Sequence, residues 1–156
     1  MSLVRALQDA RISHLDLSGS ISIPGDVSVD EVLSRMRAGR ASVALIEDAA
    51  GRLIGIFTER DVLLKIAGEP SRLRDRVQVH MTVNPQTVAP EDTAGHALQF
   101  MHTGHYRNVP VLDDDGRAVG NLGLHAVIRF LTDQFPREVY NLPPDPEQIP
   151  RTREGA

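Results

Sequence analysis

The sequence predicts an α/β (α+β) fold in which two β-α-β-β-α repeats pack with pseudo-two-fold symmetry. The first observation behind this prediction is that the chain of 156 residues matches itself at an offset of about 65 residues. The second is that each copy carries one helical apolar pattern, followed by two short apolar segments around a turn rich in Gly and Asp. About three short strands cannot bury the apolar face of a sheet alone, so we expect the two copies to pack face to face.

The internal repeat aligns apolar residues together with three glycines. The aligned pairs include Leu33 with Leu98, Met36 with Met101, Gly39 with Gly104, Gly51 with Gly116 and Gly55 with Gly120. We expect one extra residue before the first hairpin strand of the second copy. With this extra residue, Val43 would match Val109, and the following turn of the second copy would be one residue shorter to compensate.

Each copy is expected to open with a short strand, at 21–23 and at 87–89, and to continue into a helix. Ser28 and Glu31 form an S-x-x-E capping box for the first helix, and Thr93 is the equivalent N-cap of the second. The apolar faces of the two helices consist of Val29, Val32, Leu33 and Met36, and of Ala94, Ala97, Leu98 and Met101. Gly39 and Gly104 lie where each helix is expected to end in the left-handed conformation.

A hairpin and a closing helix complete each copy. We expect hairpin strands at 43–46 and 53–57 in the first copy and at 109–112 and 118–122 in the second. The closing helices are indicated by the apolar residues Val62, Leu63 and Ile66 in the first copy and Val127, Ile128 and Leu131 in the second.

These patterns divide the chain into an N-terminal segment 1–18, a first repeat 19–70, a linker with the second repeat 71–135, and a tail 136–156. The linker carries Arg72, Arg74 and Arg76, which we interpret as a solvated joint, with anion binding as the alternative. The tail holds five of the ten prolines, which exclude a regular helix or an inner strand. We expect the tail to be extended, with Tyr140 and Leu142 as apolar contacts for the body or a partner.

The composition excludes several classes of function. The chain has no Cys, which excludes disulfides and cysteine nucleophiles, and its formal charge of −4 disfavours binding to a nucleic-acid backbone. Aromatic residues make up only 4% with no Trp, so a stacking platform for single-stranded nucleic acid is not expected. No apolar run approaches the ~20 residues of a membrane-spanning helix, and residues 1–10 do not resemble a signal peptide. We therefore expect a cytoplasmic protein.

The most informative motif is Thr58-x-x-Asp61, at the junction between a predicted strand and a predicted helix. Free backbone N–H groups and the positive end of the helix dipole at such a junction attract phosphate. A carboxylate in the first turn can also accept hydrogen bonds from both hydroxyls of a ribose. The alternative interpretation is that Thr58 and Asp61 only cap the helix.

The repeat, the run Gly55-Ile56-Phe57-Thr58-Glu59-Arg60-Asp61 and the run Tyr106-Arg107-Asn108-Val109-Pro110-Val111 resemble CBS domains. The resemblance covers roughly residues 15 to 135. The arrangement of the chain is similar to that of small stand-alone bacterial proteins that contain one CBS pair, or Bateman module. It implies a regulatory, non-catalytic module that binds an adenosine-containing ligand between the repeats. AMP, ADP, ATP and S-adenosylmethionine are the candidate ligands, with no obligatory cofactor. It also implies a homodimer and a possible regulated protein partner.

The resemblance further implies a set of ligand-binding residues. Asp61, with Thr58, would bind the ribose, while Arg107 would reach phosphate, with Arg40 and His105 as further cations. The adenine would lie against apolar residues of the 21–23 and 41–44 segments, with Pro110 also lining the cleft: Ile21, Ile23, Ala41 and Ala44. The second repeat departs from the pattern because Gly123 and Ala126 replace the Thr and the Asp. We therefore expect at most one nucleotide site in each chain.

Two further features could suggest a metal site or an enzyme. His96, His102 and His105 are clustered, but no carboxylate lies at a ligand spacing, so we expect surface histidines and no metal. The run 113–116 lacks the distal Glu of a calcium loop, and neither a nucleophile elbow nor a phosphate-binding P-loop motif is present, so we do not expect an enzyme. The serious alternative is a ligand-independent structural module for dimerisation or partner docking.

Overall fold

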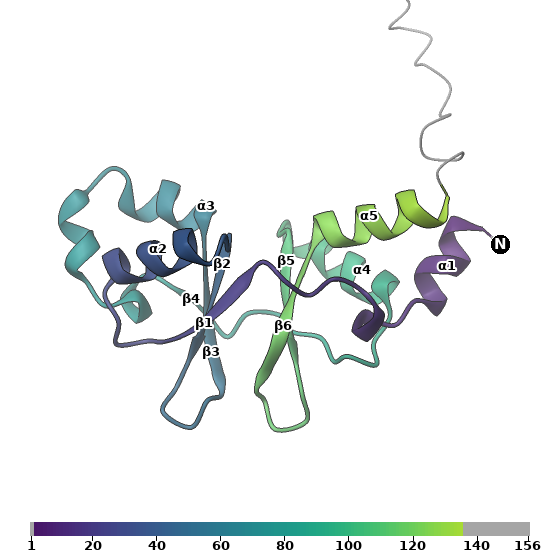
Figure 1. The fold of residues 1–156 in the computed structure, drawn as a ribbon, viewed down its shortest axis with the longest axis horizontal. Coiled ribbons are helices and arrows are strands. Elements are labelled where there is room, and N and C mark those ends of the chain that lie inside the picture. The colour runs from purple at the N-terminus through teal and green to yellow at the C-terminus, as the bar shows by residue number, and fades with distance from the viewer. Residues whose placement is uncertain (1, 136–156) are drawn as a thin grey trace, which may run out of the picture.

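The computed structural model describes residues 2–135, and the predicted tail with Tyr140 and Leu142 lies outside the described residues. Two α/β halves lie side by side, with their hairpins in the middle and their helices toward the two ends (Figure 1). This arrangement confirms the predicted fold class.

The first repeat follows the predicted order of elements. It contains β1 (Ser20–Pro24), α2 (Val29–Ala38), β2 (Val43–Glu47), β3 (Leu53–Thr58) and α3 (Glu59–Asp61), which continues into a π-helical turn (Val62–Ile66). β1 is parallel to β2, and β2 and β3 form an antiparallel hairpin. α2 buries its apolar face on this sheet, because Val29 and Val32 are fully buried and Met36 nearly so.

The second repeat contains α4 (Ala94–Gly104), β5 (Asn108–Leu112), β6 (Ala118–Gly123) and α5 (Leu124–Gln134). The strand expected at 87–89 is reduced to a single parallel bridge between Val88 and Val111. The physical reason is that the Asp92 carboxylate accepts the Ala89 N–H at 2.8 Å, which turns the backbone away from β5. The short strand predicted at 87–89 is thus present only as this bridge at Val88.

The two hairpins match at a constant offset of 65 residues. Val43 lies opposite Thr58 in the first hairpin, Asn108 lies opposite Gly123 in the second, and both ladders have an irregularity at the corresponding place. The prediction of an extra residue that would match Val43 to Val109 is therefore wrong. The apolar pattern was misleading because a polar residue, Asn108, takes the position of Val43.

The predicted helix starts are confirmed, but the predicted helix ends are displaced. Ser28 Oγ accepts the Glu31 N–H at 3.3 Å, while the Glu31 carboxylate accepts from Arg35 instead of completing the capping box. The left-handed residues are Arg40, with φ of 50°, and His105, with φ of 55°. The expectation that the preceding glycines adopt this conformation is wrong, because each helix continues through one more residue before the chain reverses.

The N-terminal segment packs on the second repeat, and the segment between the repeats packs on the first. The N-terminal helix α1 (Leu3–Asp9) and the 3₁₀ turn 12–14 pack on the second repeat, whose core contains the fully buried Ile12. The segment 70–83, with two 3₁₀ turns and β4 (Thr82–Val83), packs on the first repeat, whose core contains the fully buried Val77. The arginine-rich joint is thus folded, and Arg72 pairs with Glu69 at 2.9 Å.

The two hairpins meet through a small apolar cluster formed by Val43, Leu45 and Ile56 of the first repeat, with Leu53 and Ala118 packed against it. A backbone hydrogen bond of 3.1 Å from Leu53 N to Gly116 O joins the two turns. This contact agrees with the predicted face-to-face packing.

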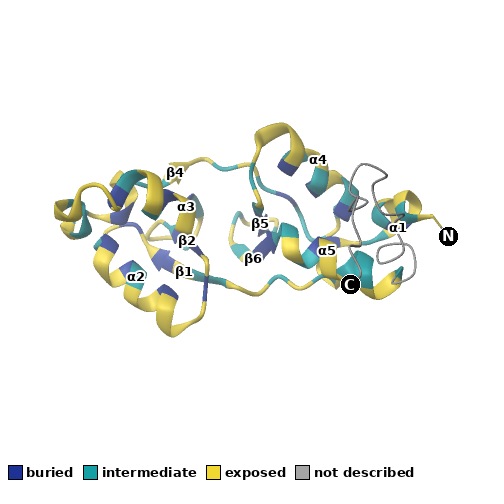
Figure 2. Cartoon of the chain, turned by 90° about the horizontal axis from the view of Figure 1, so that it is seen from above, coloured by how far each residue is buried: buried dark blue, intermediate teal, exposed yellow. Residues whose placement is uncertain are grey.

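The outward faces of the helices are exposed (Figure 2). Leu63 is 73% exposed and Ile128 is 46% exposed, so these two predicted apolar residues of the closing helices do not enter the cores. Within residues 2–135, no helix has the length and apolar character needed to cross a membrane.

Candidate functional site

The hairpin strands β3 and β6 pass into α3 and α5 on the same side of the molecule (Figure 1), and several candidate residues lie at this end of the strands. Thr58 is the last residue of β3, and Arg107 directly precedes β5. Arg60 Nη1 donates to the backbone carbonyl of His105 at 3.4 Å, which connects the two repeats at this end. The side chains of Arg40, Arg60, His105 and Arg107 are exposed.

Asp61 forms the centre of a local capping arrangement. Its Oδ2 atom accepts hydrogen bonds from Thr58 N at 2.9 Å and from Thr58 Oγ1 at 3.3 Å. Its Oδ1 atom lies 3.0 Å from Lys65 Nζ, and the residue is only 8% exposed. The capping role that the sequence left open is thus present, and each carboxylate oxygen has a partner.

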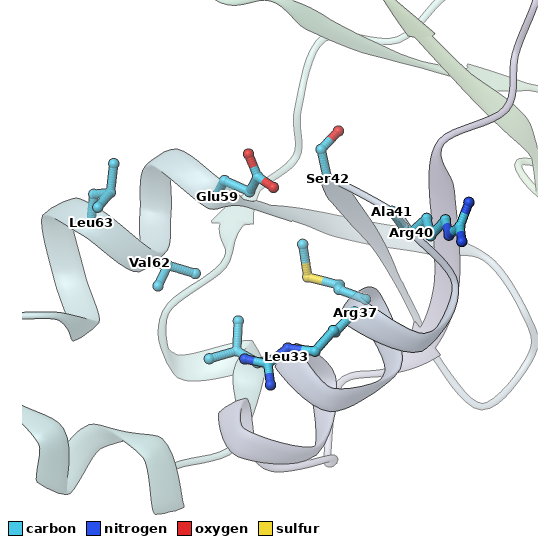
Figure 3. Close-up of a pocket in the computed structure, with 9 residues that line it drawn as sticks. Leu33, Arg37, Arg40, Ala41, Ser42, Glu59, Val62 and Leu63 are labelled. Atoms are coloured by element: carbon cyan, nitrogen blue, oxygen red, sulfur yellow. The ribbon is translucent and has the colours of Figure 1, made fainter.

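The first repeat has an open groove of about 690 Å³ between α2, the start of β2, and α3 with its π-helical turn (Figure 3). Its apolar lining comes from Leu33, Met36, Ala41, Val62 and Leu63. Its polar lining comes from Arg37, Arg40, Ser42 and Glu59. Only Arg40 and Ala41 were predicted as site residues. The apolar lining residues other than Ala41 were missed because their helical spacing is typical of core positions: Leu33, Met36, Val62 and Leu63.

The predicted adenine-binding residues do not form one wall. Ile23 and Ala44 are 1% and 0% exposed and belong to the first core, where Ile21 packs beside them. Ala41 lines the groove instead. Pro110 is buried on β5, opposite Asn121.

The second repeat holds a polar pair that the sequence analysis missed. Asn121 is 3% exposed, and its Nδ2 atom donates to Asn108 Oδ1 at 3.0 Å. Asn121 Oδ1 has no hydrogen-bond partner among the described residues. The available signal was an Asn in the interior of a strand whose equivalent, Ile56, is apolar and buried.

The junction between β6 and α5 lacks the side chains of its first-repeat counterpart. Gly123 is the N-cap of α5 and makes no side-chain hydrogen bond, and Ala126 occupies the position of Asp61. The constant hairpin offset supports this equivalence.

The predicted histidine cluster shows no metal-binding arrangement in the part of the chain that the structure describes, where no three His, Cys, Asp or Glu side chains gather. His96 stacks edge-on against Phe100, with ring centroids 4.6 Å apart. His105 lies at the left-handed end of α4.

The family model of the CBS domain matches residues 12–68 and 75–133. A CBS domain-containing protein of Arabidopsis thaliana is 30% identical over 104 residues, which are 66% of this chain and 19% of that protein. The chain therefore spans about a fifth of the length of the first curated relatives that it matches.

Two solved structures have the same fold. A CBS-domain containing protein from Agrobacterium tumefaciens superposes with a TM-score of 0.65 and 31% identity, covering 70% of this chain and 82% of that one. A CBS domain protein from Pyrobaculum aerophilum, solved in complex with AMP, superposes with a TM-score of 0.66 and 23% identity, covering 79% of this chain and 98% of that one.

Proposed function

This chain belongs to the CBS domain family, and from that premise we propose that it is a regulatory, non-catalytic module that binds an adenosine-containing nucleotide. The proposed site lies where the hairpin strands of the two repeats pass into α3 and α5. The observation that carries the proposal is the hydrogen bond from Arg60 Nη1 to the backbone carbonyl of His105, which joins the two repeats within a few residues of Arg107 and of the Thr58–Asp61 turn.

Electrostatics support a phosphate-bearing ligand. The chain has a formal charge of −4, yet Arg40, Arg60 and Arg107 are all exposed at or near this one end. Phosphate is bound in proteins by such guanidinium groups and by backbone N–H groups at helix starts. Arg107 and His105 belong to the second repeat, so the ligand would contact both repeats.

The ribose is assigned to Asp61. A carboxylate offers about four acceptor positions. Thr58 donates two hydrogen bonds to Asp61 Oδ2, and Lys65 forms an ion pair with Oδ1. The Oδ1 atom, which has Lys65 as its partner, retains capacity for a ribose hydroxyl. Because Ala126 offers no carboxylate in the second repeat, we expect one site in each chain.

The fold supports the adenosine class, because the Pyrobaculum aerophilum protein of the same fold binds AMP. AMP, ADP and ATP place phosphate near the arginines, whereas S-adenosylmethionine offers a cationic sulfonium instead. We therefore rank the phosphate-bearing ligands above S-adenosylmethionine. Binding to both repeats would give a regulatory output if two orientations of the repeats differ in affinity for the ligand.

Thermal melts with AMP, ADP, ATP, S-adenosylmethionine and NAD test the proposal. A ligand at 100 times its Kd stabilises the native state by about 2.7 kcal/mol, which raises Tm by several degrees. The Asp61→Asn variant should lose most of this rise. Asp92→Asn is the matched control, because Asp92 also caps a turn, through Ala89 N at 2.8 Å, but lies outside the proposed site. A rise that is equal in Asp61→Asn and wild type would remove Asp61 from the site.

The second candidate function is a ligand-independent module for dimerisation or partner docking. It is favoured by the exposure of Leu63, Leu64 and Ile128, at 73%, 70% and 46%, on the outward helix faces. A homodimer through these faces is compatible with both functions. Sedimentation velocity of wild type and Leu63→Ser would test the dimer, and the absence of a thermal shift with all five ligands would favour this second function.

A further inference from the structure

We propose that Lys65 couples the occupancy of Asp61 to the segment 70–83, which leads into the second repeat. The proposal rests on the function proposed above, because it concerns how binding at Asp61 is transmitted. Lys65 does not itself belong to the proposed set of ligand contacts. It acts as a positioning residue between the carboxylate and the connecting segment.

The contacts of Lys65 define the coupling. Its Nζ atom lies 3.0 Å from Asp61 Oδ1 and donates to the backbone carbonyl of His80 at 2.7 Å. Its own carbonyl accepts a hydrogen bond from Arg72 Nη1 at 2.7 Å. One side chain thus joins the site carboxylate to the connecting segment, and its backbone makes a second connection to that segment.

The His80 end of this contact is itself fixed. His80 Nε2 lies 2.8 Å from Asp75 Oδ2, and the His80 side chain is only 10% exposed. The next residues, Met81 and β4, pack against β3, where a Cβ on Gly55 would overlap Met81. β4 pairs with Ile56, which belongs to the apolar cluster between the repeats. A contiguous set of contacts therefore leads from Asp61 to the junction of the two halves.

The helix geometry around Lys65 also supports a functional role for this residue. Residues 62–66 form a π-helical turn, whereas α5 in the second repeat is a regular α-helix. Such turns are frequent at functional sites. The second repeat also lacks both partners, because Ala126 replaces Asp61 and Phe130 replaces Lys65.

Ligand binding would change the balance between the two contacts of Lys65 Nζ, with Asp61 Oδ1 and with the His80 carbonyl. A hydroxyl group that donates to Asp61 Oδ1 shares that oxygen with the ammonium and weakens the ion pair between Asp61 and Lys65. The ammonium then bonds mainly to the His80 carbonyl, which holds 78–83 more firmly against β3. We therefore expect slower amide exchange at His80 and Met81 when the site is occupied, because both amides donate to the Val77 carbonyl within this segment.

Hydrogen exchange followed by NMR tests the coupling without any ligand. Lys65→Met should speed exchange at His80 and Met81 by about tenfold, since it removes a hydrogen bond from a charged donor. Asp61→Asn should change this exchange in the Lys65 background and leave it unchanged in the Lys65→Met background. Arg35→Met is the matched control, because it removes a surface ion pair of the same spacing, to Glu31 at 2.8 Å. Equal effects of Asp61→Asn in both backgrounds would overturn the coupling.

The same measurement with AMP separates the two proposals. We expect AMP to slow exchange at His80 and Met81 in wild type and in Lys65→Arg, and not in Lys65→Met, although AMP still raises the Tm of Lys65→Met. Equal slowing in Lys65→Met would overturn the inference and leave the proposed function standing. If AMP raises no Tm, the proposed function fails for this ligand, and the ligand-free comparison still decides the coupling.

Discussion

Ala41 and Tyr106 occupy equivalent positions in the two repeats, and only Tyr106 fills the space beside its helix. The Tyr106 ring packs so closely on α4 that a Cβ on Gly104 would overlap it. In the first repeat the small Ala41 side chain instead lines the open groove. The two halves have the same topology, but the space beside the first helix of each repeat differs at this position.

This difference predicts unequal costs for two equivalent substitutions. Gly104→Ala should lower the free energy of unfolding by about 1–3 kcal/mol, because the new methyl group displaces the Tyr106 ring. Gly39→Ala should cost less, since its nearest neighbour is Ile21 Cγ2 at 3.2 Å. Urea unfolding measures both. Adding Tyr106→Ala should abolish most of the excess cost of Gly104→Ala, and additive effects would contradict this explanation.

Arg40 and His105 predict a second experiment, because both hold left-handed backbone at φ of 50° and 55°. Arg40→Gly and His105→Gly should each raise the free energy of unfolding by up to about 1 kcal/mol, since glycine adopts this conformation without strain. Arg37→Gly, within α2, is the control and should destabilise by about 1 kcal/mol. If Arg40 binds phosphate, Arg40→Gly should also weaken AMP binding. A loss of stability in both left-handed variants would contradict the argument.

The predicted order of elements is confirmed where the signals are local. Ser28 and Thr93 cap their helices through hydrogen bonds to backbone N–H groups three residues later, a contact that a short motif specifies. The hairpins follow from turns in which Asp48 and Asp113 accept nearby backbone N–H groups. These structures depend on residues within a few positions of one another, so a single sequence reveals them.

The segments that the sequence did not predict depend on distant contacts. Ile12 and Val77 lie in segments without a clear apolar periodicity, and each becomes fully buried only by packing into the core of a repeat. The groove is lined by residues of α2, β2, α3 and the turn that follows it, which only the tertiary fold brings together. The Thr58–Asp61 motif was found from sequence, whereas the Lys65 contact to His80 joins residues that no local motif relates.

The Asp16 carboxylate gives a prediction for pH dependence. The Ser18 hydroxyl and the Ser18 N–H donate to it at 2.5 and 2.9 Å, and with Arg129 at 3.4 Å they lower the pKa of Asp16. A pKa that is lower in the folded state adds stability above the unfolded value of about 3.9, and this stability is lost as pH falls through the folded value. Asp16→Asn should therefore cost less than about 1 kcal/mol at pH 7, because the side chain is half exposed.

The cost of Asp16→Asn should shrink as the pH is lowered from about 5 to about 3. Urea unfolding across this range checks the stability, and an NMR titration of the carboxyl carbon checks the pKa directly. Ser18→Ala serves as the companion variant, because it removes the hydroxyl donor and should move the pKa of Asp16 back toward its ordinary value. A cost that does not vary with pH would show that the charge of Asp16 is not its source.

The missing cap of α5 allows the Thr58–Asp61 arrangement to be rebuilt in the second repeat. Gly123 has extended backbone, with φ of −90° and ψ of 153°, and a Cβ there would meet Asn108 Oδ1 at an ordinary 3.6 Å. Gly123→Thr combined with Ala126→Asp should therefore be accommodated, and it should raise the free energy of unfolding by about 1 kcal/mol by capping α5. Ala126→Asn, which lacks the charge, is the control for Asp at this position.

If the carboxylate of such a cap is what binds ribose, the rebuilt protein should bind two AMP molecules per chain by calorimetry. A stabilised variant that still binds only one would show that the cap and the ribose site are separable, and that the first-repeat site needs more than the Thr-x-x-Asp turn.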